Sequence, residues 1–277
     1  MAAALLIVFR EIIEAGLIVG IVLAATQGVP RRGLCISGGV SAGVLGACVV
    51  AAFAGEIGNL FAGSGQELFN AGVLSLAVLM LTWHNVWMAG HGRAIARDMR
   101  NMGAAVAAGE RPMTALAVVV GVAVLREGAE VVLFLYGIAS QGGTSTQAMF
   151  VGGVLGLIAG AGVSALIYYG LLAIPAHKLF RVTSGLITLL AAGMAAQAIL
   201  FVQQGGYFEF LTNTVWDTSW LLKQDSLTGR LLHTLIGYSD APDGAHLLVY
   251  LLTIATIVLL MKWERARHVH DARAKSV

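Results

Sequence analysis

The sequence predicts an all-α integral membrane protein with seven transmembrane helices. Of its 277 residues, 58% are hydrophobic and only 12% are charged, and the mean hydropathy is +0.82. These values lie far from those of soluble globular domains. The apolar runs are about 20 residues long, as a spanning helix requires, and they lack the alternation of β-strands. Helices are therefore expected to cross the bilayer.

Seven apolar segments are predicted as spans. The first has no basic region before it, and Arg10, Glu11 and Glu14 interrupt its apolar run, so we expect a retained helix rather than a signal peptide. The seventh span is the shortest. The spans comprise residues 3–26, 34–54, 67–89, 114–138, 148–172, 182–203 and 246–262.

Basic residues predict the orientation of these spans. The connections after the odd-numbered spans are rich in Lys and Arg, whereas those after the even-numbered spans hold few positive charges. Because Lys and Arg concentrate on the cytoplasmic side, the N-terminus is predicted outside and the C-terminus in the cytoplasm. The basic residues concerned are Arg31, Arg32, Arg93, Arg97, Arg100, Arg111, Lys178, Arg181, Lys262, Arg265, Arg267, Arg273 and Lys275.

The chain repeats itself in two halves. The motif Arg-Glu-x-x-Glu at Arg10–Glu14 recurs 116 residues later at Arg126–Glu130. A ladder of small residues four apart, Gly39–Ala47, recurs 113 residues later at Gly152–Gly160. Each unit holds three spans, so the second unit crosses the membrane in the opposite sense. This is an inverted repeat of helices 1–3 and 4–6, a construction typical of transporters whose sites lie near the midplane.

The predicted organisation is a single transmembrane domain. It divides into repeat one (about 1–100), repeat two (about 112–204), an external segment (205–245), the seventh helix (246–262) and a cytoplasmic tail (263–277). The external segment contains Trp216, Trp220 and an amphipathic stretch from Leu227 to Tyr238. Trp, Tyr and amphipathic helices favour the membrane interface. We expect this segment on the outer membrane surface, with a docking platform for an outside partner as the alternative.

Each repeated motif places one Arg and two Glu on one helix face. At about 100° per residue, Arg10, Glu11 and Glu14 fall within an arc of roughly 100°. Each charged residue at the centre of a spanning helix costs roughly 2.5–3.5 kcal/mol. If each Arg only neutralised its own acids, apolar residues would serve the fold as well. The two clusters therefore favour an ion site.

The predicted ligands are the four motif carboxylates, facing one another across a pseudo-twofold axis. They are Glu11, Glu14, Glu127 and Glu130. Carboxylate oxygens suit hard cations and disfavour copper(I). Arg10 and Arg126 would support the site by holding the acids ionised and oriented. Because each motif is half of one site, neutralising either copy is expected to abolish transport about equally.

The two motifs, in the first and fourth of seven spans, resemble the oxidase-dependent iron transporter family of fungal high-affinity iron permeases and bacterial EfeU-type permeases. The length and the seven-span plan are similar across essentially the whole chain. The stretch 229–238, with Pro242 beyond it, is similar to the segment before the last span in bacterial members. The middle pairs Ile12-Ile13 and Gly128-Ala129 stand where family members often have Gly-Leu, at positions expected to face away from the site.

The resemblance implies a high-affinity iron permease in a cell membrane, here a bacterial inner membrane. It implies that the four motif glutamates bind iron, that iron is the substrate, and that no cofactor is held permanently. It also implies that separate periplasmic partners, a cupredoxin-like protein and a haem peroxidase, oxidise Fe²⁺ to Fe³⁺. The chain itself has no copper-ligand or haem-attachment motif, so it is expected to be a transporter and not an enzyme.

Four further residues are candidates for lining the ion path. His84 in the third span matches Gln197 in the sixth at the offset of 113, while Glu56 and Glu67 lie near the outer ends of spans two and three. A lone histidine in a membrane also serves as a hydrogen-bonding link between helices. Solvated loop positions are the alternative for the two acids.

Other functions stay open at this point. Carboxylates alone discriminate poorly, so a permease for Pb²⁺ or Mn²⁺ is an alternative. A membrane redox enzyme would use the glutamates as a di-iron centre or His84 and His91 as haem ligands, but the Glu-x-x-His pairs of di-iron bundles are missing. A proton-coupled carrier of organic cations would titrate the acids instead. The net charge of +2, with no basic face, argues against a nucleic-acid partner.

Overall fold

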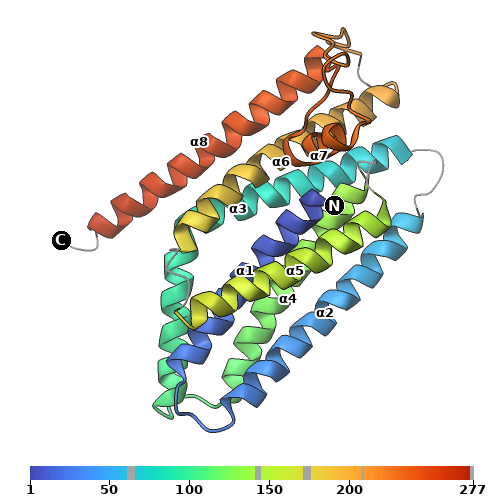
Figure 1. Cartoon of the computed structure of the whole chain (residues 1–277). Helices are drawn as coiled ribbons and strands as arrows, with labels where there is room; N and C mark the ends of the chain where they lie inside the picture. Colours follow the sequence, from blue (N-terminus) through green and yellow to red (C-terminus); the bar gives the residue numbers. More distant parts are fainter. Residues whose placement is uncertain (61–65, 141–144, 171–175, 208, 275–277) are drawn as a thin grey trace.

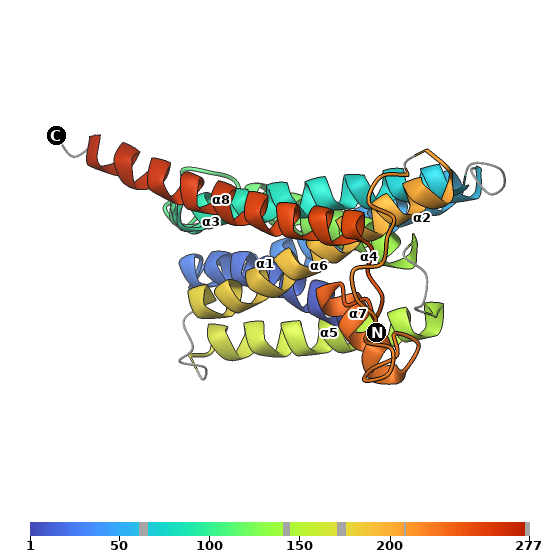
Figure 2. The same cartoon turned by 90° about the horizontal axis from the view of Figure 1, so that it is seen from above.

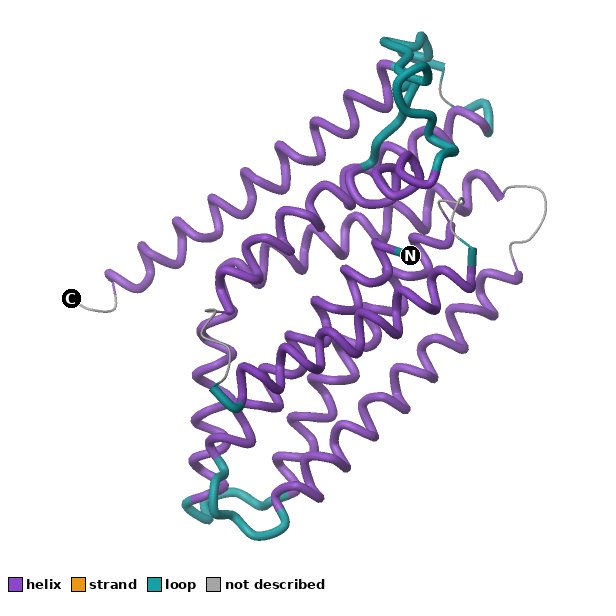
Figure 3. The backbone as a smooth tube through the Cα atoms, viewed as in Figure 1, coloured by secondary structure: helices purple, strands orange, loops and turns teal. Residues whose placement is uncertain are grey.

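The computed structural model describes residues 1–60, 66–140, 145–170, 176–207 and 209–274, and these ranges form helices joined by loops (Figures 1 and 3). The all-α prediction is confirmed. The eight helices of the described residues are α1 (Ala2–Ala25), α2 (Arg32–Leu60), α3 (Gln66–Ala107), α4 (Thr114–Ser140), α5 (Thr146–Tyr168), α6 (Ala176–Gln204), α7 (Leu227–Ile236) and α8 (Gly244–Ala274).

Two helices continue well past their predicted spans. α3 runs for 42 residues, about 63 Å at 1.5 Å per residue, through the stretch after residue 89 that the sequence assigned to a connection. α8 continues to Ala274, so the expected tail is helical over most of its length. The predicted ends followed the loss of apolar residues. Arg, Ala, Met and Lys are strong helix formers, and they extend both helices beyond the apolar run.

Among the described residues, five helices are long and apolar enough to cross a membrane. The qualifying stretches are Arg32–Phe53, Glu67–Met88, Thr146–Tyr168, Arg181–Gln204 and Gly244–Glu264. Each of these matches one of the predicted spans. The two helices that carry the repeated motifs, α1 and α4, have 24 and 27 residues. Each contains an Arg and two Glu, so their composition alone does not qualify them.

The helices pair as a twofold repeat requires. The most extensive contacts join α1 to α5, α2 to α4 and α3 to α6. Exchanging helices 1–3 with helices 4–6 leaves this set of pairs unchanged. Seen from above, α1 and α6 lie between α5 on one side and α3 with α8 on the other (Figure 2). α8, outside the repeat, packs on α6 and α3.

Close helix contacts recur in both halves at the predicted offsets. A Cβ at Gly43 would lie 2.7 Å from the carbonyl oxygen of Gly121, and one at Gly156 would lie 2.6 Å from that of Leu5. Glycine thus lets the two backbones approach. The equivalent contacts are Gly39–Ala117 with Gly152–Met1, Gly43–Gly121 with Gly156–Leu5, and Ala47–Gly128 with Gly160–Ile12. The offsets of 113 and 116 residues therefore relate equivalent positions in space.

The external segment contains the helix expected from its amphipathic stretch. This helix, α7, packs against α6 and α1. α7 is capped at its C-terminal end by Gly237, whose φ of 71° is left-handed. This backbone conformation favours glycine. A Cβ at Gly193 of α6 would lie 2.7 Å from the Cα of Gly237. Two glycines facing each other allow the end of α7 to reach α6, and an amphipathic pattern does not distinguish a membrane surface from a protein surface.

Candidate metal site

The first motif forms a buried charged face on α1. Arg10, Glu11 and Glu14 are only 2%, 0% and 4% exposed. The Nη1 of Arg10 donates to the Oε1 of Glu11 at 2.6 Å, and its Nη2 lies 2.9 Å from the Oε1 of Glu14. Spacings of one and four residues on an uninterrupted helix bring both carboxylates to one guanidinium. The predicted shared face is confirmed.

The second motif forms the matching face on α4, with looser pairing. The Nε of Arg126 donates to the Oε1 of Glu130 at 3.1 Å and lies 3.7 Å from the Oε1 of Glu127. The Arg126 side chain is 38% exposed, in contrast to the buried Arg10. Its guanidinium carbon lies 4.6 Å from the ring centre of Trp87 on α3, a cation–π distance. The two arginines therefore have different surroundings although their motifs match.

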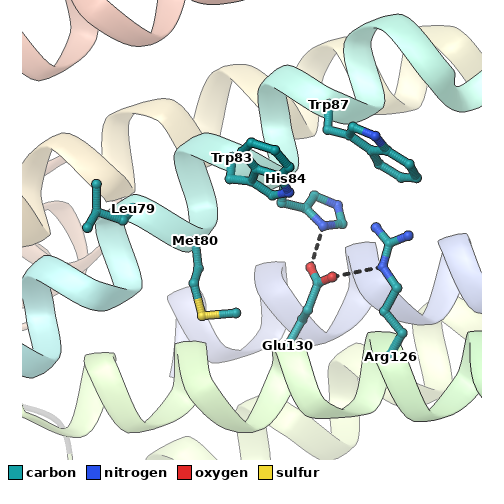
Figure 4. Close-up of a pocket in the computed structure, with 7 residues that line it drawn as sticks. All are labelled: Leu79, Met80, Trp83, His84, Trp87, Arg126 and Glu130. Carbon is teal, nitrogen blue, oxygen red and sulfur yellow. Dashed lines mark hydrogen bonds and ion pairs between the residues drawn. The ribbon is translucent and has the colours of Figure 1, made fainter.

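His84 lies between the two motifs. Its Nε2 is 3.3 Å from the Oε2 of Glu14, and its Nδ1 faces the Oε2 of Glu130. The side chain is buried, and α3 carries it to the contact between α1 and α4 (Figure 4). His84 thus links the first motif to the second, and so α3 to α1 and α4.

Four side chains bring possible ligand atoms close together. Glu11, His84, Glu127 and Glu130 each offer one atom, and these atoms lie within 4.8 Å of one another. Ligand atoms bound to one cation at about 2.0–2.6 Å lie no more than about 5 Å apart. Glu11 and Glu127 also each have a buried Oε2 that accepts no hydrogen bond from the described residues. Buried anionic oxygen without a partner is costly, and a cation offsets that cost.

A pocket of about 630 Å³ adjoins the site on the side of α3 and α4. Its walls are mainly apolar, and two motif residues and His84 are among the residues that line it. The lining residues are Leu79, Met80, Trp83, His84, Trp87, Arg126 and Glu130 (Figure 4). The pocket is far larger than one ion, so it is a space next to the ligands and not the ligand cage itself.

The other predicted path residues lie apart from the cluster. Gln197 is half-buried on α6, and the hydrogen bonds described for the carboxylates do not include it. Glu67 is exposed in the first turn of α3. The side chain of Glu56 lies outside the described residues. Of the three candidates whose side chains the structure describes, His84 alone contacts the motifs.

Two residues near the site, Trp87 and Asn85, were not predicted from the sequence. Trp87 follows His84 by three residues on α3, so both side chains lie on the same helix face. This spacing was the available signal that Trp87 lies near the site. Asn85 is buried and donates from Nδ2 to the backbone oxygen of Ser184 and to the Oγ1 of Thr188, both at 3.4 Å. Both partners are on α6. A polar pair, His84 with Asn85, inside an apolar span was the available signal.

The chain is similar to known iron permeases over nearly its whole length. A family model described as the iron permease FTR1 family matches residues 1–263. The ferrous iron permease EfeU of Yersinia pestis is 32% identical over 259 residues, which cover 92% of this chain and 91% of the relative. Those of Escherichia coli O6:H1 and Shigella sonnei are 32% and 31% identical and cover 89% of this chain. No solved structure matches the chain.

Proposed function

The chain belongs to the iron permease FTR1 family, and we propose that it carries iron across the cell membrane through one site between α1, α3 and α4. The observation that carries this proposal is the set of buried ligand atoms from both motifs and His84 within 4.8 Å. Similar proteins are named ferrous iron permeases. These names favour transport over the redox-enzyme alternative and iron over lead or manganese.

Seven helices cross the membrane in this proposal. α1 and α4 are 24 and 27 residues long, about 36 and 40 Å at 1.5 Å per residue, which exceeds the roughly 30 Å hydrocarbon core. Arg10, Glu11, Glu14 and Glu127 are buried among the helices, and the half-exposed Arg126 packs over Trp87 of α3. We therefore count α1 and α4 with the five apolar spans as crossing helices. The basic connections give an outside N-terminus and a cytoplasmic C-terminus. Iron therefore moves inward, across a bacterial inner membrane.

The arginines balance the acids in the absence of iron. Arg10 pairs with both carboxylates of its motif, and Arg126 pairs with Glu130. Charge-assisted hydrogen bonds of this kind keep carboxylates ionised and oriented. When a cation enters, part of this pairing is exchanged for ligand bonds, and when the cation leaves, the pairing is restored. Binding strong enough for entry yet weak enough for release is what transport needs.

Oxidation belongs to other proteins in this proposal. The cluster holds carboxylates and a single histidine, a set suited to binding and passing an ion. A cupredoxin-like protein and a haem peroxidase in the periplasm are the proposed partners. They would meet the outer side of the permease, where the loops around α7 carry exposed Trp220 and Leu221.

Uptake into proteoliposomes tests the proposal. Vesicles with the wild-type chain, kept anaerobic with a reductant, are expected to accumulate Fe²⁺. Glu11→Gln and Glu127→Gln each remove a buried ligand charge and should reduce uptake to the rate of empty vesicles. The control is Glu110→Gln, in the exposed turn between α3 and α4, which should transport at the wild-type rate. Wild-type uptake by both ligand variants would reject the site.

A further inference from the structure

The ligand atoms that gather most closely are not those of the four motif glutamates. The group within 4.8 Å consists of Glu11, Glu127, Glu130 and His84. Glu14 is outside it, although Glu14 holds the same motif position as Glu130. The two halves of the repeat therefore contribute unequally to the site, and the difference centres on Glu14 and His84.

Glu14 forms ion pairs with two other side chains. Its Oε1 lies 2.9 Å from the Nη2 of Arg10, and its Oε2 lies 3.3 Å from the Nε2 of His84. A histidine that binds a metal through one ring nitrogen usually donates the N–H of the other to a carboxylate or carbonyl. Glu14 occupies that outer position for His84. With the proton on Nε2, the lone pair of Nδ1 points toward Glu130 and the other ligand atoms.

The formal charges favour a divalent ion. With His84 as a neutral ligand, four carboxylates and two guanidinium groups leave two negative charges, which one divalent cation balances. Balance matters because uncompensated charge inside a membrane protein is costly. An imidazole nitrogen suits Fe²⁺ and later transition metals, whereas Mg²⁺, Ca²⁺ and Mn²⁺ prefer oxygen ligands.

We propose that the transported ion is bound as a divalent transition metal by the Nδ1 of His84 together with one oxygen each of Glu11, Glu127 and Glu130. Glu14 is a positioning residue that fixes the ring of His84 and pairs with Arg10. His84 is then the residue that makes the site prefer Fe²⁺ over harder ions. This inference rests on the proposed function for the identity of the substrate, but its geometry does not depend on transport.

The repeat provides a matched comparison for His84. The equivalent position in the second half is Gln197, which does not share hydrogen bonds with the carboxylates in the described structure. His84→Gln therefore gives both halves the same residue and exchanges a ring nitrogen for a harder amide oxygen. Gln197→Asn changes the equivalent side chain on α6 while leaving His84 in place.

Pulsed EPR of bound Mn²⁺ tests the nitrogen ligand. The full-length protein in lipid nanodiscs is loaded with Mn²⁺, and the nitrogen coupling of a directly bound imidazole is recorded. Wild type, Gln197→Asn and Glu14→Gln should show this coupling, and His84→Gln should lose it. The wild-type spectrum alone can contradict the proposal, so the test remains valid even if a variant fails to fold. A wild-type spectrum without imidazole coupling, or a coupling that persists in His84→Gln, overturns the proposal.

Competition between Fe²⁺ and Mn²⁺ tests the selectivity. His84→Gln should lower the ratio of Fe²⁺ to Mn²⁺ affinity by about tenfold or more, because the softer ligand is lost. Glu14→Gln should weaken both ions by roughly 10–100-fold, as changes to outer partners of metal ligands do, with the ratio retained. An unchanged ratio in His84→Gln contradicts the proposal. Imidazole coupling in a protein that does not transport iron would instead refute the proposed function and leave this site standing.

Discussion

The ring of His84 lies 3.3 Å from the carboxylate of Glu14. The opposite ring nitrogen faces Glu130, so one side chain of α3 joins two motifs that are 116 residues apart in the chain. The two motifs are consequently joined into one charged cluster, as the proposed single site requires. Loss of either motif, or of the link between them, should affect the whole site.

The arginines are expected to contribute unequally to stability. Arg10 is buried with two carboxylates, and removing one partner of a buried ion pair costs about 3–5 kcal/mol. Arg126 is 38% exposed at its side chain, beside the pocket, and its contacts with Glu127 and Glu130 are longer, at 3.7 and 3.1 Å, so its loss should cost less. Thermal unfolding in detergent should give a clearly lower Tm for Arg10→Gln than for Arg126→Gln.

The control for this prediction removes the charge that is left unpaired. Arg10→Gln combined with Glu14→Gln should recover part of the Tm lost by Arg10→Gln alone, because one buried carboxylate is neutralised along with its partner. Equal Tm values for the two single Arg variants would contradict the difference in burial.

Equivalent glycines of the two repeats are expected to be equally sensitive to substitution by alanine. In Gly43→Ala the new Cβ would meet the backbone of Gly121, and in Gly156→Ala that of Leu5. A backbone cannot move aside as a side chain does, so each variant should lose about 1–3 kcal/mol. The fraction of monodisperse protein after heating measures this loss.

Glycines without neighbours supply the comparison. A Cβ at Gly72 or Gly185 would have no contact within 4 Å, although both are related by the same offset of 113 residues. Gly72→Ala and Gly185→Ala should be neutral or stabilising by up to about 1 kcal/mol, because alanine favours the helix. A stable Gly156→Ala beside an unstable Gly43→Ala would argue against the symmetry of the packing.

The proposed orientation predicts which loops react with a membrane-impermeant thiol reagent. Asp225 before α7 and Glu110 between α3 and α4 are both exposed. With Cys35 and Cys48 replaced by Ser, Asp225→Cys should be labelled in intact cells, whereas Glu110→Cys should be labelled only after permeabilisation. The opposite pattern would reverse the direction of the whole chain, including its N-terminus.

Much of this fold follows from local patterns in the sequence. Apolar length predicts the spans because lipid requires every backbone group to be bonded within the helix. The glycine ladders predict helix pairing because a contact such as Gly43–Gly121 needs two residues without bulk. Composition could not locate the ends of α3 and α8, where helix-forming polar residues follow the apolar run.

The site is less evident from the sequence than the fold. Motif spacing predicts which residues share a helix face, and Arg10 with Glu11 and Glu14 confirms it. Motif spacing does not indicate how close α3 comes to α1 and α4. The contacts of His84 could therefore be identified only from the tertiary structure. The repeat suggested four equivalent glutamates. Side chains outside the motifs, Trp87 and His84, break that equivalence.

The number of iron ions bound per chain shows whether both motifs form a single site. The protein is purified anaerobically with Fe²⁺, and iron per chain is measured for wild type, Glu11→Gln and Glu127→Gln, with Glu110→Gln as control. We expect one iron in wild type and control and almost none in either ligand variant. Two irons in wild type, with one retained in each variant, would show two independent half-sites and contradict the single site.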